Sequence, residues 1–247
     1  MKRLALLHTV LFLADVFKKK IAARYPDLDS FHVVDESLLP ELMKSGGIMT
    51  PGLVRRIAAQ AGLARDAGAG LILFTCSSTS PAVDLVRPLI DVPIIKIDDP
   101  MAMRAVRLGE RIGVVCTAKT TFLPSQNLIR QHAALLGRNV RIQARLESAA
   151  FEAVMAGDKT RHDELVKQVA VELSRECDVI VLAQASMAHL APELNESLRI
   201  PVLAGPDLCV EALADYLEDR IGVPQEASVT PKCSSICLLP TEVAPSN

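Results

Sequence analysis

Aromatic residues are scarce in this sequence. Tryptophan is absent, and only 2 Tyr and 6 Phe occur among the 247 residues, whereas half of all residues are hydrophobic. The core must therefore be aliphatic, and the length allows one large domain or two medium ones. Lys and Arg number 27 against 29 Asp and Glu, and no long basic block occurs. This balance argues against nucleic acid as a partner.

Signals for metal and cofactor binding are also missing. The six cysteines are scattered without metal-ligand spacing, and a disulfide framework is not expected in a chain of this size. The stretch AGAG at residues 67–70 precedes a predicted strand instead of following it, so it does not match a dinucleotide-binding loop. We therefore expect no metal, no cofactor, and reduced thiols in the cytoplasm. The cysteines are Cys76, Cys116, Cys177, Cys209, Cys233 and Cys237.

The N-terminal segment MKRLALLHTVLFLA allows two interpretations. Its basic start and apolar run are compatible with a signal peptide. Alternatively, residues 3–7 form a first strand and residues 10–24 a helix. His8, Thr9 and Asp15 interrupt the apolar run and favour the strand. No later segment has the length and apolarity of a membrane span, so we expect no membrane partner.

Short apolar runs alternate with longer amphipathic stretches. Apolar strands between helices indicate a parallel sheet covered on both faces, which is an α/β architecture. Residues 223–247 lose this periodicity and gather Pro and Ser, so they are expected to form a peripheral tail. The predicted strands cover residues 3–8, 31–34, 70–75, 92–97, 111–116, 139–144, 178–183 and 200–205, and the predicted helices cover 10–24, 51–67, 81–90, 100–109, 122–137, 147–156, 160–176, 187–198 and 206–220.

An internal repeat organises the chain. The segment RLALLHT, which starts at Arg3, matches RIGVVCT, which starts at Arg111, with an offset of 108 residues. The same offset aligns Cys76 with Gln184, and it aligns the Pro-Ile-Ile and Pro-Val-Leu segments of two later strands. Three matches in one register predict two pseudo-symmetric parallel-sheet α/β halves, residues 1–98 and 99–206. The helix near residues 206–220 is expected to pack back on the first half.

Two similar halves predict a site in the cleft between them, because ligands of parallel α/β sheets bind beyond the carboxyl ends of the strands. Hydroxyl and small side chains dominate those ends, which suits a small carboxylate held by neutral donors. Ser77, Ser78 and Thr79 have an alternative role as caps of the following helix, and we expect at least one of them to serve as a cap. The candidate ligand-contacting residues are His8, Thr9, Thr75, Ser77, Ser78, Thr117, Thr120, Thr121, Gln184, Ala185 and Ser186.

Three stretches carry a resemblance to a known family. The segments TCSS at residues 75–78, GVVCTAKTT at 113–121 and VIVLAQASMA at 179–188 resemble the aspartate/glutamate/hydantoin racemase superfamily. The resemblance covers roughly residues 3–220. It implies two pseudo-symmetric α/β domains with the active site between them, and a reaction without cofactor on a small carboxylic acid. It also implies two catalytic cysteines, one from each half, and Cys76 matches the first of them.

The second cysteine of that pattern is absent, because Gln184 occupies its position. Stereoinversion by two bases needs a proton-exchanging group on each face of the α-carbon. Glutamine cannot exchange a proton, although it can donate and accept hydrogen bonds. His189, five residues further on, is a candidate for the second acid or base, but a histidine at such a position is more often a surface helix residue.

Three classes of function stay open. The favoured one is a cofactor-independent, racemase-like isomerase that acts by proton transfer or thiol addition, with Cys76 as the base or nucleophile. The second is a single-cysteine lyase of the decarboxylase type, and the third is a non-catalytic protein that binds a small carboxylate. In the last case Cys76 would be a small buried apolar residue, the commonest role of a cysteine at a strand end. A homo-oligomer is compatible with each class.

Overall fold

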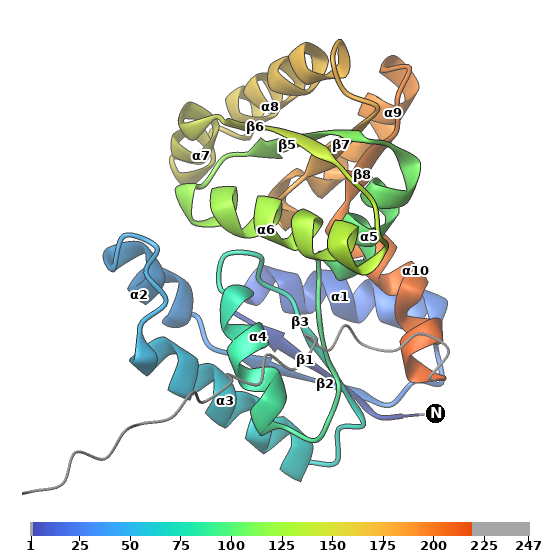
Figure 1. Ribbon diagram of the computed structural model, residues 1–247. Helices are drawn as coiled ribbons and strands as arrows, with labels where there is room; N and C mark the ends of the chain where they lie inside the picture. Colours follow the sequence, from blue (N-terminus) through green and yellow to red (C-terminus); the bar gives the residue numbers. More distant parts are fainter. Residues whose placement is uncertain (1, 219–247) are drawn as a thin grey trace, which may run out of the picture.

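Two four-stranded parallel sheets form the framework of the protein. The computed structural model describes residues 2–218 (Figure 1). The first sheet contains β1 (Leu4–His8), β2 (Ser30–Val34), β3 (Leu71–Phe74) and β4 (Ile94–Lys96), in the order β2-β1-β3-β4. The second contains β5 (Arg111–Cys116), β6 (Arg141–Leu146), β7 (Val179–Leu182) and β8 (Val202–Ala204), in the order β6-β5-β7-β8. The equal strand orders confirm the two like α/β halves that the sequence repeat predicts.

Helices cover both faces of each sheet. In the first half, α2 (Leu38–Lys44), α3 (Pro51–Asp66) and α4 (Pro81–Val86) pack on one face, and α1 (Leu11–Arg24) packs on the other. In the second half, α5 (Asp99–Leu108) and α6 (Lys119–Leu135) pack on one face. The opposite face carries α7 (Ser148–Met155), α8 (Lys159–Ser174), the 3₁₀ helix η2 (Ala185–Leu190) and α9 (Ala191–Ser197). A further 3₁₀ turn, η1 (Arg87–Leu89), follows α4.

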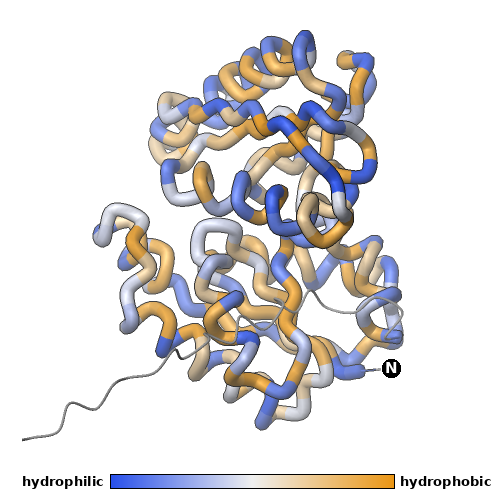
Figure 2. Tube along the Cα trace, in the orientation of Figure 1, coloured by the Kyte–Doolittle hydropathy of each residue, from blue (hydrophilic) through white to orange (hydrophobic). Residues whose placement is uncertain are grey.

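Each central strand is buried on both sides, as a covered parallel sheet requires. In β1, Leu4 and Leu6 face α1, whereas Ala5 and Leu7 face the layer of α2, α3 and α4. Figure 2 shows the same pattern as hydrophobic colouring along the strands of both halves. The cores are accordingly mainly aliphatic, and Phe17 and Phe74 are the largest side chains that are almost completely buried.

The last described helix, α10 (Gly205–Leu217), leaves β8 of the second sheet and returns to the first half (Figure 1). Its residues Cys209, Leu213 and Tyr216 pack into the core beneath α1 and β1. The chain therefore crosses between the halves twice, once between β4 and α5 and once between β8 and α10.

The helices differ from the prediction in several places, and the predicted helix 81–90 is divided into α4 and η1. Helix α2 is absent from the sequence prediction, and its Leu38 and Leu42 are buried in the first core. Helix α6 begins at Lys119 instead of residue 122, which places Thr120 and Thr121 in its first turn. The predicted helix 187–198 is divided into η2 and α9. The tail at residues 223–247, with Cys233 and Cys237, lies outside the described residues.

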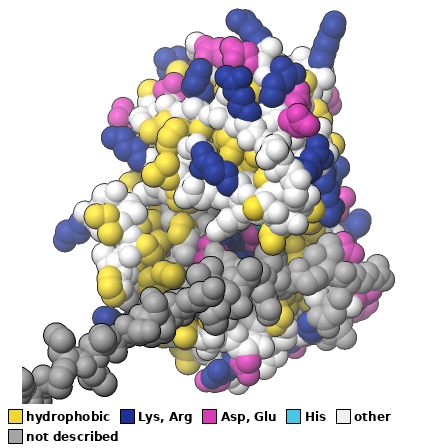
Figure 3. Space-filling model, viewed as in Figure 1, with side chains coloured by type: hydrophobic (Ala, Val, Ile, Leu, Met, Phe, Trp, Pro, Cys, Tyr) yellow, Lys and Arg dark blue, Asp and Glu magenta, His cyan; other side chains and the backbone are white. Residues whose placement is uncertain are grey.

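Within residues 2–218, no helix has both the length and the apolar character needed to cross a membrane. On the face drawn in Figure 3, Lys and Arg side chains lie interspersed with Asp and Glu over the second half, and hydrophobic side chains gather near α2. Met43 and Ile48, at and beyond the end of α2, are among the exposed large hydrophobic residues.

Candidate active site

The carboxyl ends of the two sheets lie close together between the halves. The Ser78 hydroxyl, in the turn after β3, lies 2.9 Å from the Thr120 hydroxyl at the start of α6. This hydrogen bond joins the two halves directly. The structure thus brings together the two candidate segments that follow β3 and β5.

Cys76 follows β3 as a free thiol and is 7% exposed. Its side chain packs in the core of the first half. The adjacent Ser77 and Ser78 are 8% and 9% exposed. The thiol therefore lies at the boundary between an apolar core and a polar turn.

The hydroxyl side chains after β3 do not cap α4, contrary to the expectation from the sequence. Ser80 is the N-cap residue of α4 and its side chain makes no capping hydrogen bond. Instead, the Ser80 hydroxyl donates to the carbonyl of Ser77 at 3.0 Å, and Ser78 binds Thr120. The Thr79 hydroxyl is buried without a partner, and the Thr9 hydroxyl after β1 is in the same condition. Buried hydroxyls without a hydrogen-bond partner are uncommon in folded proteins.

His8 lies beneath this layer in a chain of hydrogen bonds. The Thr75 hydroxyl donates to the carbonyl of Leu7 at 3.0 Å and lies 2.9 Å from His8 Nδ1. His8 Nε2 lies 2.8 Å from His32 Nδ1 on β2, and the two rings are stacked. Burial, reinforced by His32, lowers the pKa of His8 to about 4. His8 is therefore neutral near pH 7. Both of its ring nitrogens already have hydrogen-bond partners, His32 and Thr75, so its role is structural.

Gln184 follows β7, and its side-chain oxygen faces a set of hydrogen-bond donors at the start of α6. Oε1 accepts hydrogen bonds from the backbone N–H of Thr117 at 2.6 Å and of Ala118 at 3.1 Å. The Thr117 hydroxyl donates to the same oxygen at 3.0 Å. Because backbone N–H groups only donate, the oxygen and not the amide nitrogen must occupy this position. The Gln184 NH₂ group is thereby directed away from the α6 terminus.

Thr121 and Cys116 complete the second side of the site. The Thr121 hydroxyl donates to the carbonyl of Ala118 at 2.9 Å and lies 3.5 Å from Gln184 Oε1. Cys116, at the end of β5, is fully buried in the core of the second half. Burial raises the pKa of its thiol to about 12, so it stays protonated. Cys116 is thus a packing residue and no second thiolate.

Asp98 is not among the candidates from the sequence, and it lies between β4 and α5 as the N-cap residue of α5. It is 5% exposed, and its Oδ1 lies against Gly205, where an added Cβ atom would be 2.8 Å away. Burial raises the pKa of Asp98 to about 7. An aspartate in a short predicted loop gives no signal of this environment, because the burial arises from both halves together.

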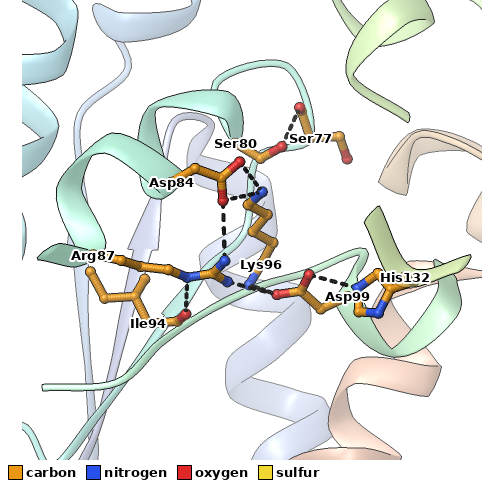
Figure 4. A network of polar contacts seen from close by, with 8 residues as sticks. All are labelled: Ser77, Ser80, Asp84, Arg87, Ile94, Lys96, Asp99 and His132. Carbon is orange, nitrogen blue, oxygen red and sulfur yellow. Dashed lines mark hydrogen bonds and ion pairs between the residues drawn. The ribbon is translucent and has the colours of Figure 1, made fainter. Parts of the chain in front are cut away.

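A buried network of charges lies beside the turn that carries Cys76 (Figure 4). Lys96 Nζ lies 2.5 Å from Asp84 Oδ1, and Arg87 lies 3.1 Å from Asp84 and 3.0 Å from Asp99. Asp99 in turn lies 3.1 Å from His132 Nε2 on α6. Burial alone would raise the pKa of Asp99, but His132, Arg87 and Lys96 outweigh it and hold that pKa below its usual value. The network therefore fixes α4 and β4 against α6 across the two halves.

A pocket of about 250 Å³ opens between α4 and α6 next to this network. Its walls include Ser80, Pro81 and Lys96 from the first half and Leu123 and Gln131 from the second. The pocket reaches Ser80 in the turn before α4, whereas Cys76 and Gln184 are not among its lining residues.

The other candidate residues after β7 lie apart from this arrangement. His189 Nε2 lies 2.9 Å from Asp163 on α8, and α8 covers the face of the second sheet opposite α6. The structure thus pairs His189 with Asp163 and does not bring it to Gln184. Ala185 and Ser186 begin η2, and Ala185 packs against the core that contains α10. Among residues 2–218, no group of three or more His, Cys, Asp or Glu side chains could hold a metal ion.

Comparison with known proteins identifies the family. Residues 13–213 match the Asp/Glu/hydantoin racemase family, and the chain therefore belongs to it. A glutamate racemase of Trichodesmium erythraeum is 28% identical over 137 residues, which are 53% of this chain and 49% of that protein. The chain thus spans about half the length of this relative.

Solved structures share the fold. An allantoin racemase from Klebsiella pneumoniae is 18% identical, with 92% of each chain covered and a TM-score of 0.66. A glutamate racemase from Francisella tularensis, in complex with D-glutamate, is 15% identical with a TM-score of 0.66, covering 92% of this chain and 84% of that one. At these identities the likeness establishes the α/β fold and its two halves.

Proposed function

We propose that this protein is a cofactor-independent, racemase-like isomerase that acts on a small carboxylic acid through one thiol, that of Cys76. The observation that carries the proposal is the contrast between Cys76 and Gln184. These residues occupy equivalent positions after β3 and β7, yet one has an exchangeable proton and the other is an amide locked by Thr117 and Ala118. Membership of the racemase family supports proton transfer as the class of chemistry.

Neutral donors would bind the carboxylate of the substrate. The Thr9 and Thr79 hydroxyls are buried without partners, and those of Ser78 and Thr120 bind only each other. A carboxylate between the halves would accept hydrogen bonds from such groups, and charge-assisted bonds of this kind are about twice as strong as neutral ones. The nearby cation, Lys96, is already paired with Asp84. The binding side thus favours small acids held by hydroxyl groups.

Gln184 would serve as a fixed hydrogen-bond donor. Its oxygen is held by three donors, so its NH₂ group has one preferred direction and needs little reorganisation on binding. In proton transfer, the Cys76 thiolate removes the α-proton, the electron pair moves into the carboxyl group, and an N–H donor stabilises the oxygen that gains charge. The proton then returns to carbon from the same thiol. In thiol addition, the Cys76 thiolate bonds to one carbon of a double bond, and the electron pair moves through the neighbouring carbon into its carboxyl group. After rotation about the resulting single bond, the electron pair returns, the double bond forms again and the thiolate leaves.

A single thiol also has a stereochemical consequence. Proton removal and return by Cys76 occur on one face of the carbanion, so exchange with solvent would exceed inversion. The same arrangement suits a decarboxylase-type lyase, in which the thiol protonates the carbanion after CO₂ has left. The lyase is a second candidate function because Gln184 stands where a second thiol would be.

Proton exchange in D₂O tests the proposal. NMR would follow aspartate, glutamate, hydantoins, malonates and maleate with the wild-type protein, Cys76→Ala and His189→Ala. Exchange or isomerisation by the wild type and His189→Ala, and its absence in Cys76→Ala, is the expected result. Release of CO₂ from a malonate would select the lyase. If no compound reacts, and a carboxylate binds the wild type and Cys76→Ala equally in thermal-shift titration, the protein is a binding protein and the proposal is wrong.

A further inference from the structure

The pocket between α4 and α6 is a concave site of its own. Its volume is about 250 Å³, and both halves contribute walls, with Ser80 and Lys96 on one side and Leu123 on the other. On the face drawn in Figure 3 the surface is hollowed between the halves, and acidic and basic side chains are visible inside the hollow. Cys76 and Gln184 do not line the pocket. It is therefore separate from the residues to which the reaction is assigned.

A buried ammonium group forms part of the pocket wall. The Lys96 side chain is 3% exposed, and its Nζ lies 2.5 Å from Asp84 Oδ1 and 2.6 Å from Asp84 Oδ2. Arg87 pairs with the same carboxylate at 3.1 Å, so two cations share Asp84. An ammonium group has three N–H donors, and the two oxygens of Asp84 take two of them. The third N–H can donate to an acceptor atom of a ligand.

Helix α6 supplies the opposite wall, which has amide and apolar side chains. Asn127 and Gln131 lie about one turn apart on α6 and both line the pocket, together with Leu123 and Pro124. The Asn127 side-chain oxygen accepts a hydrogen bond from Arg130 at 3.0 Å, which leaves the NH₂ group of Asn127 as a donor. An apolar lining with a few polar groups is typical of sites for small molecules.

A further cation lies at one end of the pocket. Lys119 is the first residue of α6 and lies about one turn before Leu123, so the two residues share one side of the helix. The Lys119 side chain is exposed, and among residues 2–218 no acidic side chain pairs with it. A cation is unfavourable at the start of a helix, where the dipole is positive. An anion bound beside Lys119 would offset this cost.

We propose that the pocket between α4 and α6 is a second ligand site, which binds a small organic anion with an apolar stem. The anionic group would accept hydrogen bonds from Lys96 and the α6 amides, and the stem would contact Leu123 and Pro124. Lys119 supplies the positive charge that selects an anion. Because the pocket is smaller than the roughly 300–1,000 Å³ of drug-sized sites, the ligand has about ten non-hydrogen atoms. This site does not depend on the proposed function, since no residue of that reaction lines it.

Titration with benzoate, followed through the backbone amide signals in ¹⁵N–¹H NMR spectra, tests the proposal without an assay of activity. Benzoate has one carboxylate on an apolar ring, whereas benzyl alcohol is neutral and benzylamine is cationic. We expect a Kd of roughly 1 mM for benzoate, with shifts at residues 80–84 and 123–131, and binding of the other two compounds at least about fivefold weaker. Cys76→Ala should bind benzoate in this pocket as the wild type does.

Two variants alter the charge of the pocket. Gln131→Glu places a carboxylate in its wall, so benzoate should bind at least about fivefold more weakly. Lys119→Gln removes the cation at its end, so binding should weaken by about twofold to fivefold, the usual range for an exposed pair. The matched control is Lys159→Gln, because Lys159 is also exposed, also begins a helix, α8, and does not line the pocket. This control changes the net charge equally and should leave benzoate binding unchanged.

The outcomes separate the site from its alternatives. Shifts confined to the surroundings of Thr117 and Gln184 would place benzoate in the proposed reaction site and overturn the second site. Equal affinity for benzyl alcohol or benzylamine, or equal weakening by Lys159→Gln, would overturn the selection of an anion. No shift at roughly 10 mM benzoate would overturn the proposal as a whole. If benzoate binds as expected while no acid exchanges in D₂O, only the proposed function is wrong.

Discussion

Gln184 Oε1 lies 2.6 Å from the backbone nitrogen of Thr117, and the N–H of Ala118 and the hydroxyl of Thr117 point at the same oxygen. The start of a helix is a favourable place for an anion, because its N–H groups are free and its dipole is positive. Here the chain fills that place with its own amide oxygen. The second half of the site is thereby preorganised for donation by an NH₂ group, and the two halves, though alike in fold, differ in chemistry.

Substitution of Gln184 should separate its two roles. Gln184→Glu keeps an oxygen at the α6 terminus and adds a favourable charge there, so the free energy of unfolding should be unchanged or rise by about 0.3–1 kcal/mol. Gln184→Ala leaves two N–H groups without their acceptor and should cost about 1–3 kcal/mol. Both variants lose the NH₂ donor and should weaken carboxylate binding. Urea unfolding and ligand titration measure the two effects, and equal stability of the two variants would contradict the hydrogen-bond assignment.

Gln184→Cys should restore a proton-exchanging group opposite Cys76. Exchange by the wild type is expected with little inversion, whereas the variant should gain inversion of an α-chiral acid, because each face of the carbanion then has a thiol. Polarimetry or chiral chromatography of the exchanged substrate measures the outcome. The control is Gln184→Ser, which is similarly small but has no thiol. Equal inversion by the Cys and Ser variants would show that the position does not face the α-carbon.

Asp98 should make the protein less stable as the pH rises. Its pKa is about 7 in the folded protein and about 3.8 when unfolded, so the folded state binds more protons between these values and loses stability as the pH increases. His8 acts in the opposite direction, since its folded pKa of about 4 is lowered from 6.5 and stability falls as the pH drops through that range. Asp98→Asn should therefore be more stable than the wild type above pH 7, by at most about 4 kcal/mol.

Urea unfolding at pH 4, 6 and 8 checks the sign of the Asp98 effect. The stability difference between Asp98→Asn and the wild type should grow from pH 4 to pH 7 and then stay constant. A difference that shrinks with pH would mean that the folded protein stabilises the ionised carboxylate, which is contrary to its burial.

Asp84 should be the most sensitive member of the buried charge network. Asp84→Asn leaves Lys96, which is 2% exposed, without its carboxylate partner, and loss of one partner of a buried pair typically costs about 3–5 kcal/mol. The double variant Asp84→Leu with Lys96→Met should cost less than the sum of the single changes. Lys20→Ala, which breaks an exposed pair with Asp207, is the control and should cost about 1 kcal/mol or less. Similar losses for Asp84 and Lys20 variants would contradict the burial of this pair.

Gly205 should be required by the close approach of the two chain crossings. A Cβ atom there would lie 2.8 Å from Asp98 Oδ1 and 3.3 Å from the carbonyl oxygen of Ile97, so Gly205→Ala should cost about 1–3 kcal/mol. Gly62→Ala in α3 is the matched control, because nothing lies within 4 Å of its added Cβ atom. That change should be neutral or stabilise the helix by about 0.5–1 kcal/mol. Thermal unfolding of both variants distinguishes them, and a neutral Gly205→Ala would show that the crossings are not tightly packed.

The strands and the twofold division could be predicted from the sequence, because buried parallel strands leave continuous apolar runs and the repeat keeps one register. Helix α2 could not, since Pro40 lies inside it and Gly46 and Gly47 follow it, a pattern typical of loops. The position of Gln184 could be predicted from its alignment with Cys76, but the capture of its oxygen by Thr117 depends on how β5 and β7 pair. The burial of Asp98 could not be predicted, because it depends on the two chain crossings, β4 to α5 and β8 to α10, and on the turn that contains Ser77. Local patterns thus determine the elements, whereas contacts between halves determine the chemistry of the site.

In the proposed function, one thiol, that of Cys76, moves the proton. The most direct measurement is the initial rate of α-proton exchange in D₂O, with the stereochemistry of the exchanged acid, for the wild type and Cys76→Ala. The account predicts exchange that exceeds inversion in the wild type and loss of exchange by at least about a hundredfold in the variant, the usual contribution of a positioned acid–base group. Exchange that continues unchanged in Cys76→Ala would contradict the claim and place the proton-transferring group elsewhere.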